Sequence, residues 1–239
     1  MTELAIKVRG LQAWYGESHV LHGIDLDIPA GKVVSLLGRN GAGRTTILRA
    51  LMNLMVQKKG EIHVNGKDVS RYKTYQMARL GLGYCPEERG IFSNLSCYEN
   101  LMLPPNIGSK SKRSAGMSLE QIYELFPNLK ERRNAPGSHL SGGEQQMLAV
   151  ARILRAGAKI LLIDEISEGL APVIVETLDG LIRKLKGMMY TVVLVEQNFH
   201  FASGLADSFY VIEHGTVIEH FSKEQLDAKK EELELLLGV

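Results

Sequence analysis

Residues 38–45 read GRNGAGRT and directly follow the apolar run KVVSLL at 32–37. The octapeptide matches the phosphate-binding pattern G-x-x-x-x-G-K-[ST] at every position but one, because Arg44 stands where the pattern has lysine. After the loop, Ile47 and Leu51 recur at helical spacing. A glycine loop between a strand and a helix is the setting in which backbone amides and a helix N-terminus bind phosphate. The stretch therefore predicts an α/β fold that binds a phosphate group.

The loop residues have distinct expected roles. Glycines let backbone N–H groups turn toward an anion without a Cβ clash, and the hydroxyl of Thr45 suits Mg²⁺. Arg44 keeps the positive charge of lysine, but its guanidinium is a longer, planar fork. We expect nucleotide binding to persist, because most donors are backbone groups, and turnover to suffer, since loss of one aimed donor costs about 10²–10³ in rate. The predicted nucleotide-binding residues here are Gly38, Arg39, Asn40, Gly41, Ala42, Gly43, Arg44, Thr45 and Thr46. The alternative is a glycine-rich turn that binds no ligand.

Two more continuous apolar runs, at 160–163 and 191–195, predict strands covered on both faces, as in a parallel sheet. Amphipathic helices are expected before them, at 145–154 and 174–185. Strands and helices therefore alternate in the order typical of an α/β domain.

The remaining segments have other patterns. Residues 61–64 and a hairpin over 209–219 predict an antiparallel β part beside the parallel core. Residues 104–118 have the composition of a loop. Residues 224–237 predict a final amphipathic helix.

Composition limits the function. The chain has 239 residues, 45% of them hydrophobic, which suffices for one large α/β domain or two small ones. Its formal net charge of +1 lacks the basic surplus typical of a nucleic-acid partner. Cys85 and Cys97 form no disulfide or metal pattern, which favours a reducing compartment. We see neither a signal-peptide pattern nor a run near the ~20 apolar residues of a membrane span, so a function at a membrane requires another chain.

A second motif, LSGGEQQ at 140–146, follows the loop in the sequence, and Asp164-Glu165 end the strand at 160–163. With the loop, these motifs resemble the ATP-binding cassette (ABC) ATPase family nearly from end to end. The resemblance implies an ABC-type P-loop NTPase fold with a mostly parallel core sheet, an antiparallel β subdomain and a helical signature subdomain. It implies a single ABC ATPase domain over 1–239, with the helical subdomain at approximately 88–157.

The resemblance also assigns roles to residues, with ATP and Mg²⁺ as ligands. It implies a general base at Glu165, a γ-phosphate contact at Gln197 and an adenine-stacking ring at Tyr15. Thr45, Glu87 and Asp164 are the expected metal ligands. Ser141, Gly142, Gly143 and Glu144 are expected at a helix start, where they close over the ATP of a partner cassette. Two adjacent acids after a strand are otherwise an ordinary solvated strand end, and Tyr15 an ordinary surface tyrosine.

Further motifs, YELFP at 123–127, SEGLAP at 167–172 and VEQN at 195–198, resemble one subfamily. It comprises the ATP-binding subunits of branched-chain amino acid importers, with urea and short-chain amide relatives. Glu87 and Gln197 are ordinary in that group. Two residues depart from the group. Arg44 stands where the pattern has lysine, and Ile166 stands where a proline normally follows the Asp-Glu pair. Isoleucine frees a backbone N–H and relaxes φ, so we expect a looser placement of Glu165. Both departures predict reduced catalytic speed but not a different fold.

The expected function is therefore the ATP-hydrolysing subunit of a bacterial importer, cytoplasmic and peripheral on the inner face of the plasma membrane. Its expected partners are a second cassette, identical or related, transmembrane permease subunits that dock at 87–103, and indirectly a periplasmic solute-binding protein. One alternative is a regulatory subunit that binds nucleotide with weak or no hydrolysis, because of Arg44 and Ile166. A soluble ABC ATPase of DNA repair or translation fits poorly in 239 residues.

Overall fold

Six strands form the core sheet of the computed structural model, which describes residues 3–54, 57–104 and 116–237. The strands are β3 (Val33–Leu37), β6 (Leu82–Cys85), β7 (Ile160–Asp164), β8 (Thr191–Val195), β9 (Ser208–Glu213) and β10 (Thr216–Ser222). Their order across the sheet is β10-β9-β3-β8-β7-β6. All neighbours pair in parallel except β9 and β10. The predicted strands at 160–163 and 191–195 and the mostly parallel core sheet are confirmed.

A second, antiparallel sheet lies beside the core sheet. It contains β1 (Leu4–Tyr15), β2 (Ser18–Pro29), β4 (Gln57–Val64) and β5 (Lys67–Asp68) in the order β2-β1-β4-β5. The predicted strand at 61–64 is the second half of β4. The prediction that the hairpin at 209–219 belongs to this antiparallel part is wrong, because β9 pairs in parallel with β3 inside the core sheet. A hairpin pattern reveals local pairing but not which sheet receives it.

The helices of the described residues are α1 (Arg44–Leu51), α2 (Thr74–Arg79), α3 (Cys97–Met102), α4 (Leu119–Leu125), α5 (Pro127–Glu131), α6 (Gly142–Arg155), α7 (Pro172–Gly187), α8 (Phe199–Leu205) and α9 (Leu226–Leu237). The predicted helices at 145–154 and 174–185 are confirmed within α6 and α7. α6 starts three residues earlier than predicted because Ser141 caps it. Among the described residues, no helix has the length and apolar character needed to cross a membrane.

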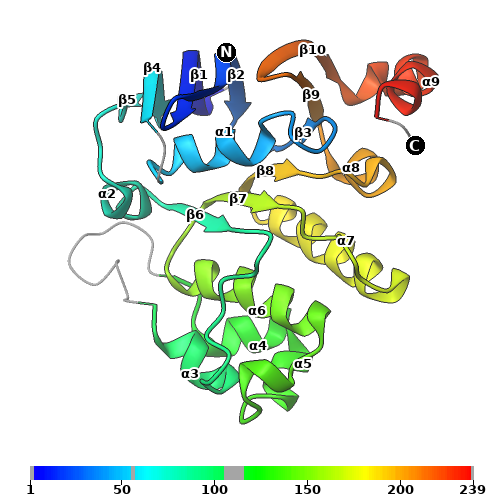
Figure 1. Cartoon of the computed structure of the whole chain (residues 1–239). Coiled ribbons are helices and arrows are strands. Elements are labelled where there is room, and N and C mark those ends of the chain that lie inside the picture. The colour runs from blue at the N-terminus through cyan, green and yellow to red at the C-terminus, as the bar shows by residue number, and fades with distance from the viewer. Residues whose placement is uncertain (1–2, 55–56, 105–115, 238–239) are drawn as a thin grey trace.

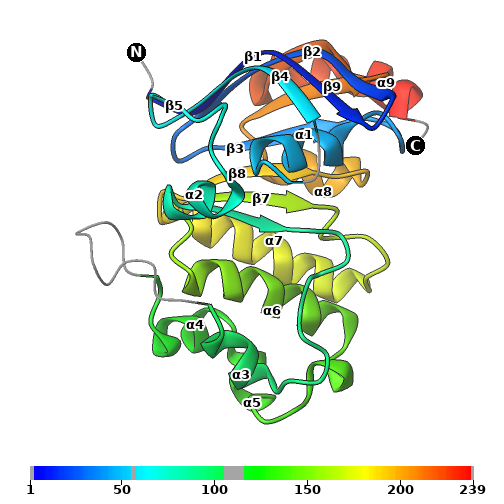
Figure 2. The same cartoon turned by 60° about the vertical axis from the view of Figure 1, so that its left-hand side comes forward.

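Two hydrophobic cores lie on opposite faces of the core sheet. Strand β3 contributes to both, because Val34 and Leu36 pack with the α1 residues Ile47 and Leu48, whereas Val33 faces the core that contains α6 and α7. α1 therefore lies between the two sheets, and α3 to α7 lie on the far side of the core sheet (Figures 1 and 2). How these layers divide into domains stays a prediction.

The carboxyl ends of β3, β8 and β7 meet at one edge of the core sheet. These strands are neighbours in parallel register. The glycine loop follows β3, Asp164-Glu165 end β7, and Glu196-Gln197 follow β8. Sequence segments more than a hundred residues apart are thus placed side by side, as is usual for ligand sites in open α/β sheets.

A helix ends the described part of the chain. The predicted C-terminal helix is confirmed as α9, preceded by a 3₁₀ turn at Lys223–Gln225. Leu233 and Leu237 are buried in the core on the α6 side. Of the loop predicted at 104–118, residues 105–115 lie outside the described residues.

The turn between β9 and β10 supports the glycine loop from behind. Gly215 has a φ of 72°, and its N–H donates to the carbonyl of Ala42 at 2.9 Å. Its own carbonyl accepts from the N–H of His22 at 2.8 Å. A Cβ at this position would overlap the carbonyl oxygen of Val20. Gly215 is therefore required both for its backbone conformation and for its lack of a side chain.

We expect Gly215→Ala to lower the free energy of unfolding by more than about 3 kcal/mol, because it combines strain with a backbone clash. Gly66→Ala is the matched control, since Gly66 has a φ of 75° but no neighbour near a built Cβ. Its cost should be only about 1–2 kcal/mol. Urea unfolding followed by circular dichroism measures both. If both variants lose the same unfolding free energy, the predicted clash at position 215 is wrong.

Candidate nucleotide-binding site

The glycine loop encloses a cavity of about 370 Å³. Its lining residues come from the loop, from the ends of neighbouring strands and from the following turns: Val20, Asn40, Gly41, Ala42, Gly43, Arg44, Thr45, Thr46, Glu87, Glu165 and Glu168. Most of the predicted loop residues, the predicted metal ligands Thr45 and Glu87 and the predicted base Glu165 therefore share one space, whereas the lining among the described residues does not include Gly38, Arg39, Asp164 or Gln197. The roles of the individual residues stay predictions.

The loop backbone has the shape of an anion cradle. Gly41 and Gly43 have φ values of 80° and 105°, and the buried Ala42 lies between them. Such an alternation turns successive N–H groups toward one point. α1 begins immediately after Gly43, which adds the positive end of its dipole.

Thr45, which lines this cavity, is hydrogen-bonded to the buried Asp164 at the end of β7. The hydroxyl of Thr45 donates to Asp164 Oδ1 at 3.2 Å, and the phenol of Tyr84 donates to Oδ2 at 3.0 Å. Burial raises the pKa of Asp164, and the hydrogen bonds from Tyr84 and Thr45 oppose that rise. Both carboxylate oxygens are thus held in place. Tyr84 was not predicted, and no motif at that position points to it.

Arg44 does not extend freely into the cavity. Its side chain is 4% exposed. Nη2 lies 2.9 Å from Glu165 Oε1 and 3.2 Å from Asn40 Oδ1. Nη1 donates to the backbone carbonyl of Glu196 at 2.7 Å. Burial lowers the pKa of the guanidinium while the surrounding acids raise it. The cation that replaces lysine is therefore held by three protein groups.

Glu165 sits at a strained position. Its φ is 48°, and its N–H donates to the carbonyl of Val195 at 2.9 Å. Carboxylate oxygens of Glu87, Glu165 and Glu168 lie within 4.8 Å of one another. Burial first, and then the hydrogen bond with Glu168, raise the pKa of Glu165 despite the opposing charge of Arg44. A carboxyl group with a raised pKa is suited to accept a proton near neutral pH.

Glu196 is a further buried acid that the motif analysis did not single out. It is 1% exposed. Its carboxylate accepts from the N–H of Ser167 at 3.1 Å and from the Ser167 hydroxyl at 2.7 Å. Burial raises the pKa of Glu196 to about 7. This residue ties the turn after β7 to the end of β8. The sequence signal that could have identified Glu196 is its position next to Gln197, directly after the predicted strand at 191–195.

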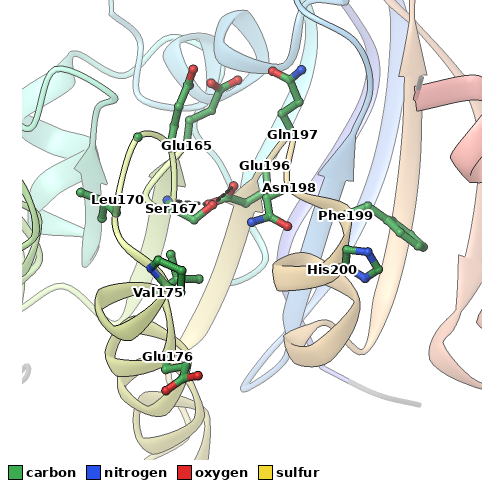
Figure 3. Close-up of a pocket in the computed structure, with 13 residues that line it drawn as sticks. Glu165, Ser167, Leu170, Val175, Glu176, Glu196, Gln197, Asn198, Phe199 and His200 are labelled. Carbon is green, nitrogen blue, oxygen red and sulfur yellow. Dashed lines mark hydrogen bonds between the residues drawn. The ribbon is translucent and has the colours of Figure 1, made fainter. Parts of the chain in front are cut away.

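Gln197 lines a second hollow of about 730 Å³ together with Glu165 and His200. Figure 3 shows Glu165 and Gln197 directed toward the same end of it. The predicted base and the predicted γ-phosphate contact are therefore neighbours across β7 and β8. His200 lies farther along, on α8 beside Phe199.

Two predicted parts lie elsewhere. The lining residues of the loop cavity, within the described ranges, do not include Tyr15; it ends β1 and is hydrogen-bonded to Arg49, whose pKa it raises.

The signature residues Ser141–Glu144 begin α6, on the other face of the core sheet. There the Ser141 side chain accepts from the Glu144 N–H at 3.3 Å, and Glu144 accepts from the Ser141 N–H at 2.8 Å. A signature on the far face cannot act in the cavity of its own chain.

Ile166, the other departure from the expected pattern, is fully buried in the core on the α6 side. A hydrophobic side chain at this position is therefore explained by packing. Its effect on the placement of Glu165 stays a prediction.

We expect Glu196→Gln to change how stability depends on pH. The folded-state pKa of about 7 lies above the ordinary 4.5, so the folded chain keeps a proton that the unfolded chain releases. This group therefore makes the protein less stable as pH rises from 4.5 to 7. The unfolding free energy of the wild type relative to Glu196→Gln should fall by roughly 2–3 kcal/mol across that range.

Thermal or urea unfolding of both proteins between pH 5 and pH 8 measures the difference. Glu176→Gln, at an exposed position in the same hollow, is the control and should show no such trend. A constant difference between wild type and Glu196→Gln would contradict the prediction.

Comparisons with known proteins agree with this geometry. The sequence family described as "ABC transporter" matches residues 21–168. The chain is 37% identical over 210 residues to the high-affinity branched-chain amino acid transport ATP-binding protein BraG of Pseudomonas aeruginosa, and the match covers 88% of this chain and 89% of BraG. It is 30% identical over 217 residues to the lipopolysaccharide export system ATP-binding protein LptB of Escherichia coli, covering 90% and 89%.

Among solved structures, the ADP conformation of MJ1267, described as an ATP-binding cassette of an ABC transporter, superposes over 100% of both chains with a TM-score of 0.82. Its sequence identity is 19%, so this likeness concerns the fold. The predicted fold class and the predicted resemblance are both confirmed.

Proposed function

We propose that this chain, which belongs to the ABC transporter family, is the ATP-hydrolysing subunit of a bacterial importer of branched-chain amino acids. That the chain is an ATPase of the ABC type follows from the family. The importer and its solute are the proposal. It is supported chiefly by one observation: a loop cavity lined by Glu165 and by Thr45, which is hydrogen-bonded to Asp164, in a chain 37% identical to BraG.

The cavity fits a nucleotide's phosphates. The left-handed glycines at 41 and 43 form a concave backbone, α1 starts directly after it, and Arg44 is among the residues that line the cavity. Oxygen ligands of the kind that Mg²⁺ prefers are present in the Thr45 hydroxyl and the Asp164 carboxylate, with Glu87 at the rim. Bound Mg²⁺ would neutralise phosphate charge.

Catalysis in this proposal is carried out by Glu165 and Gln197. Glu165 orients a water molecule and accepts its proton, for which its raised pKa is suited. Gln197, from the end of the adjacent strand, contacts the transferred phosphoryl group. Asp164 stays fixed by Thr45 and Tyr84 while the reaction proceeds.

The signature residues at Ser141–Glu144 require a second cassette. They stand at the start of α6, where Ser141 is exposed and Gly143 is buried, on the other face of the core sheet from the loop of their own chain. We infer that they close over the nucleotide of a partner cassette, identical or related. The capping contacts of Ser141 and Glu144 hold that helix start in the form that presents backbone N–H groups to an anion.

The permease partner would dock beside β6 and α6. A hollow of about 460 Å³ lies there, lined by Phe92, Leu103 and Arg152 among others. Phe92 is 50% and Leu103 48% exposed, so both offer apolar surface. Leu101, which lies in the predicted docking segment 87–103, is fully buried and belongs to the core instead. Docking on a permease would place the chain on the cytoplasmic face of the plasma membrane, with a periplasmic solute-binding protein as indirect partner.

The alternative of a regulatory subunit without hydrolysis is not supported, since the chain belongs to a family of ATPases. The likeness to LptB leaves export as a second candidate, at lower identity than BraG.

We expect Glu165→Gln to lower the turnover number for magnesium-ATP by about 10²–10⁴, because it removes the general base. Phosphate release from the purified chain measures it. Glu61→Gln, an exposed acid on β4, should turn over like the wild type. Undiminished turnover in Glu165→Gln would refute the assignment.

For the solute, we expect that a strain lacking this chain loses most high-affinity uptake of labelled leucine, isoleucine and valine. The wild-type gene should restore uptake and Glu165→Gln should not. Normal uptake combined with defective lipopolysaccharide export would favour the second candidate.

A further inference from the structure

Arg44 and Glu165 form a buried ion pair. Their side chains are 4% and 10% exposed, and Nη2 and Oε1 are 2.9 Å apart. The guanidinium uses its other terminal nitrogen on the Glu196 carbonyl at 2.7 Å. The predicted base is thus paired with the cation of the phosphate loop.

Arg44 is also one of the residues that line the loop cavity. A phosphate group in that cavity accepts hydrogen bonds from a guanidinium in the planar, paired geometry that a carboxylate also uses. Phosphate and Glu165 therefore compete for Nη2. Separation of a buried ion pair without replacement is strongly unfavourable, so the guanidinium leaves Glu165 only in exchange for another anion.

We propose that Arg44 is a nucleotide-released clamp on Glu165, which holds the base while the loop is empty and frees it when phosphate takes the guanidinium. The inference rests on the proposed roles of the loop and of Glu165. It makes Arg44 a positioning residue for the base as well as a nucleotide contact.

The fate of Glu165 after release follows from its neighbours. Its carboxylate lies within 4.8 Å of those of Glu87 and Glu168. Without the charge of Arg44, these like charges repel it. The hollow that it shares with Gln197 is open to it, so release directs the base toward the proposed reaction side.

A lysine at this position would not provide the same clamp. The fork of Arg44 reaches Glu165 with one nitrogen and the Glu196 carbonyl with the other. An ammonium group has its three donors on one atom, which cannot span both acceptors in this way. The departure at position 44 therefore has a structural consequence of its own, separate from any loss of catalytic speed.

A double-mutant cycle tests the clamp. The full-length chain is prepared as wild type, Arg44→Lys, Glu165→Gln and the double variant, and binding of ADP without Mg²⁺ is measured by calorimetry. ADP is chosen because it supplies phosphates without hydrolysis. We expect Glu165→Gln to tighten ADP binding about tenfold when Arg44 is present, since the competing carboxylate is gone, and at most about twofold when it is combined with Arg44→Lys.

Glu168→Gln is the matched control, because it removes one charge from the same acidic cluster without a contact to Arg44 among the described hydrogen bonds and ion pairs. It should tighten binding no more than about twofold. If Glu168→Gln and Glu165→Gln act equally, the effect is one of general charge and the clamp is overturned.

Thermal unfolding of the same four proteins gives a second readout that is independent of binding. The cycle should show coupling between Arg44 and Glu165 without nucleotide and lose it with saturating ADP. Coupling that is absent without nucleotide, or that is unchanged by ADP, overturns the clamp. Failure of every protein, the wild type included, to bind ADP overturns the proposed function and the clamp with it.

Discussion

The parallel pairing of β3, β8 and β7 is the constraint on which the site depends. Because neighbouring parallel strands end together, the loop after β3, the acids after β7 and the Glu196-Gln197 pair after β8 reach one edge of the sheet. The two hydrophobic cores on either face fix the strands in that register. Backbone hydrogen bonds between the strands, together with the burial of Val, Ile and Leu side chains, thus bring site residues from distant segments of the sequence together.

Low solvent access then sets the electrostatics of this edge. Arg44, Asp164, Glu165 and Glu196 are all buried, so each charge is strongly affected by the groups that it touches. Asp164 is satisfied by two hydroxyl donors, Glu196 by Ser167, and Glu165 by Arg44. The partner of each buried carboxylate also determines whether an incoming anion can displace that carboxylate.

Much of this arrangement could be predicted from the sequence, because the strands at 160–163 and 191–195 and the helices around 145–154 and 174–185 have strong periodicity. The long strands β1 and β2 escaped prediction, since each mixes polar and apolar residues across irregular register. The hairpin at 209–219 was recognised but placed in the wrong sheet, because parallel pairing of β9 with β3 joins segments far apart in sequence.

The phosphate loop and Asp164-Glu165 were visible as motifs, whereas the partners of Arg44, the tie between Glu196 and Ser167, and Tyr84 depend on side-chain geometry that no local pattern encodes.

The hydrogen bonds of Gly215 have a consequence for biosynthesis. They join Gly215, in the turn between β9 and β10, to Ala42 in the phosphate loop and to His22 in β2. A chain emerging from the ribosome has made the loop long before it makes this turn, and contacts across such sequence distances form late because ordering the intervening chain is entropically unfavourable. Until β9 and β10 have been synthesised, the loop lacks this support. The nascent protein therefore acquires its finished loop only after the turn between these two strands has been made, which delays any engagement of cellular ATP until the core sheet can fold around it.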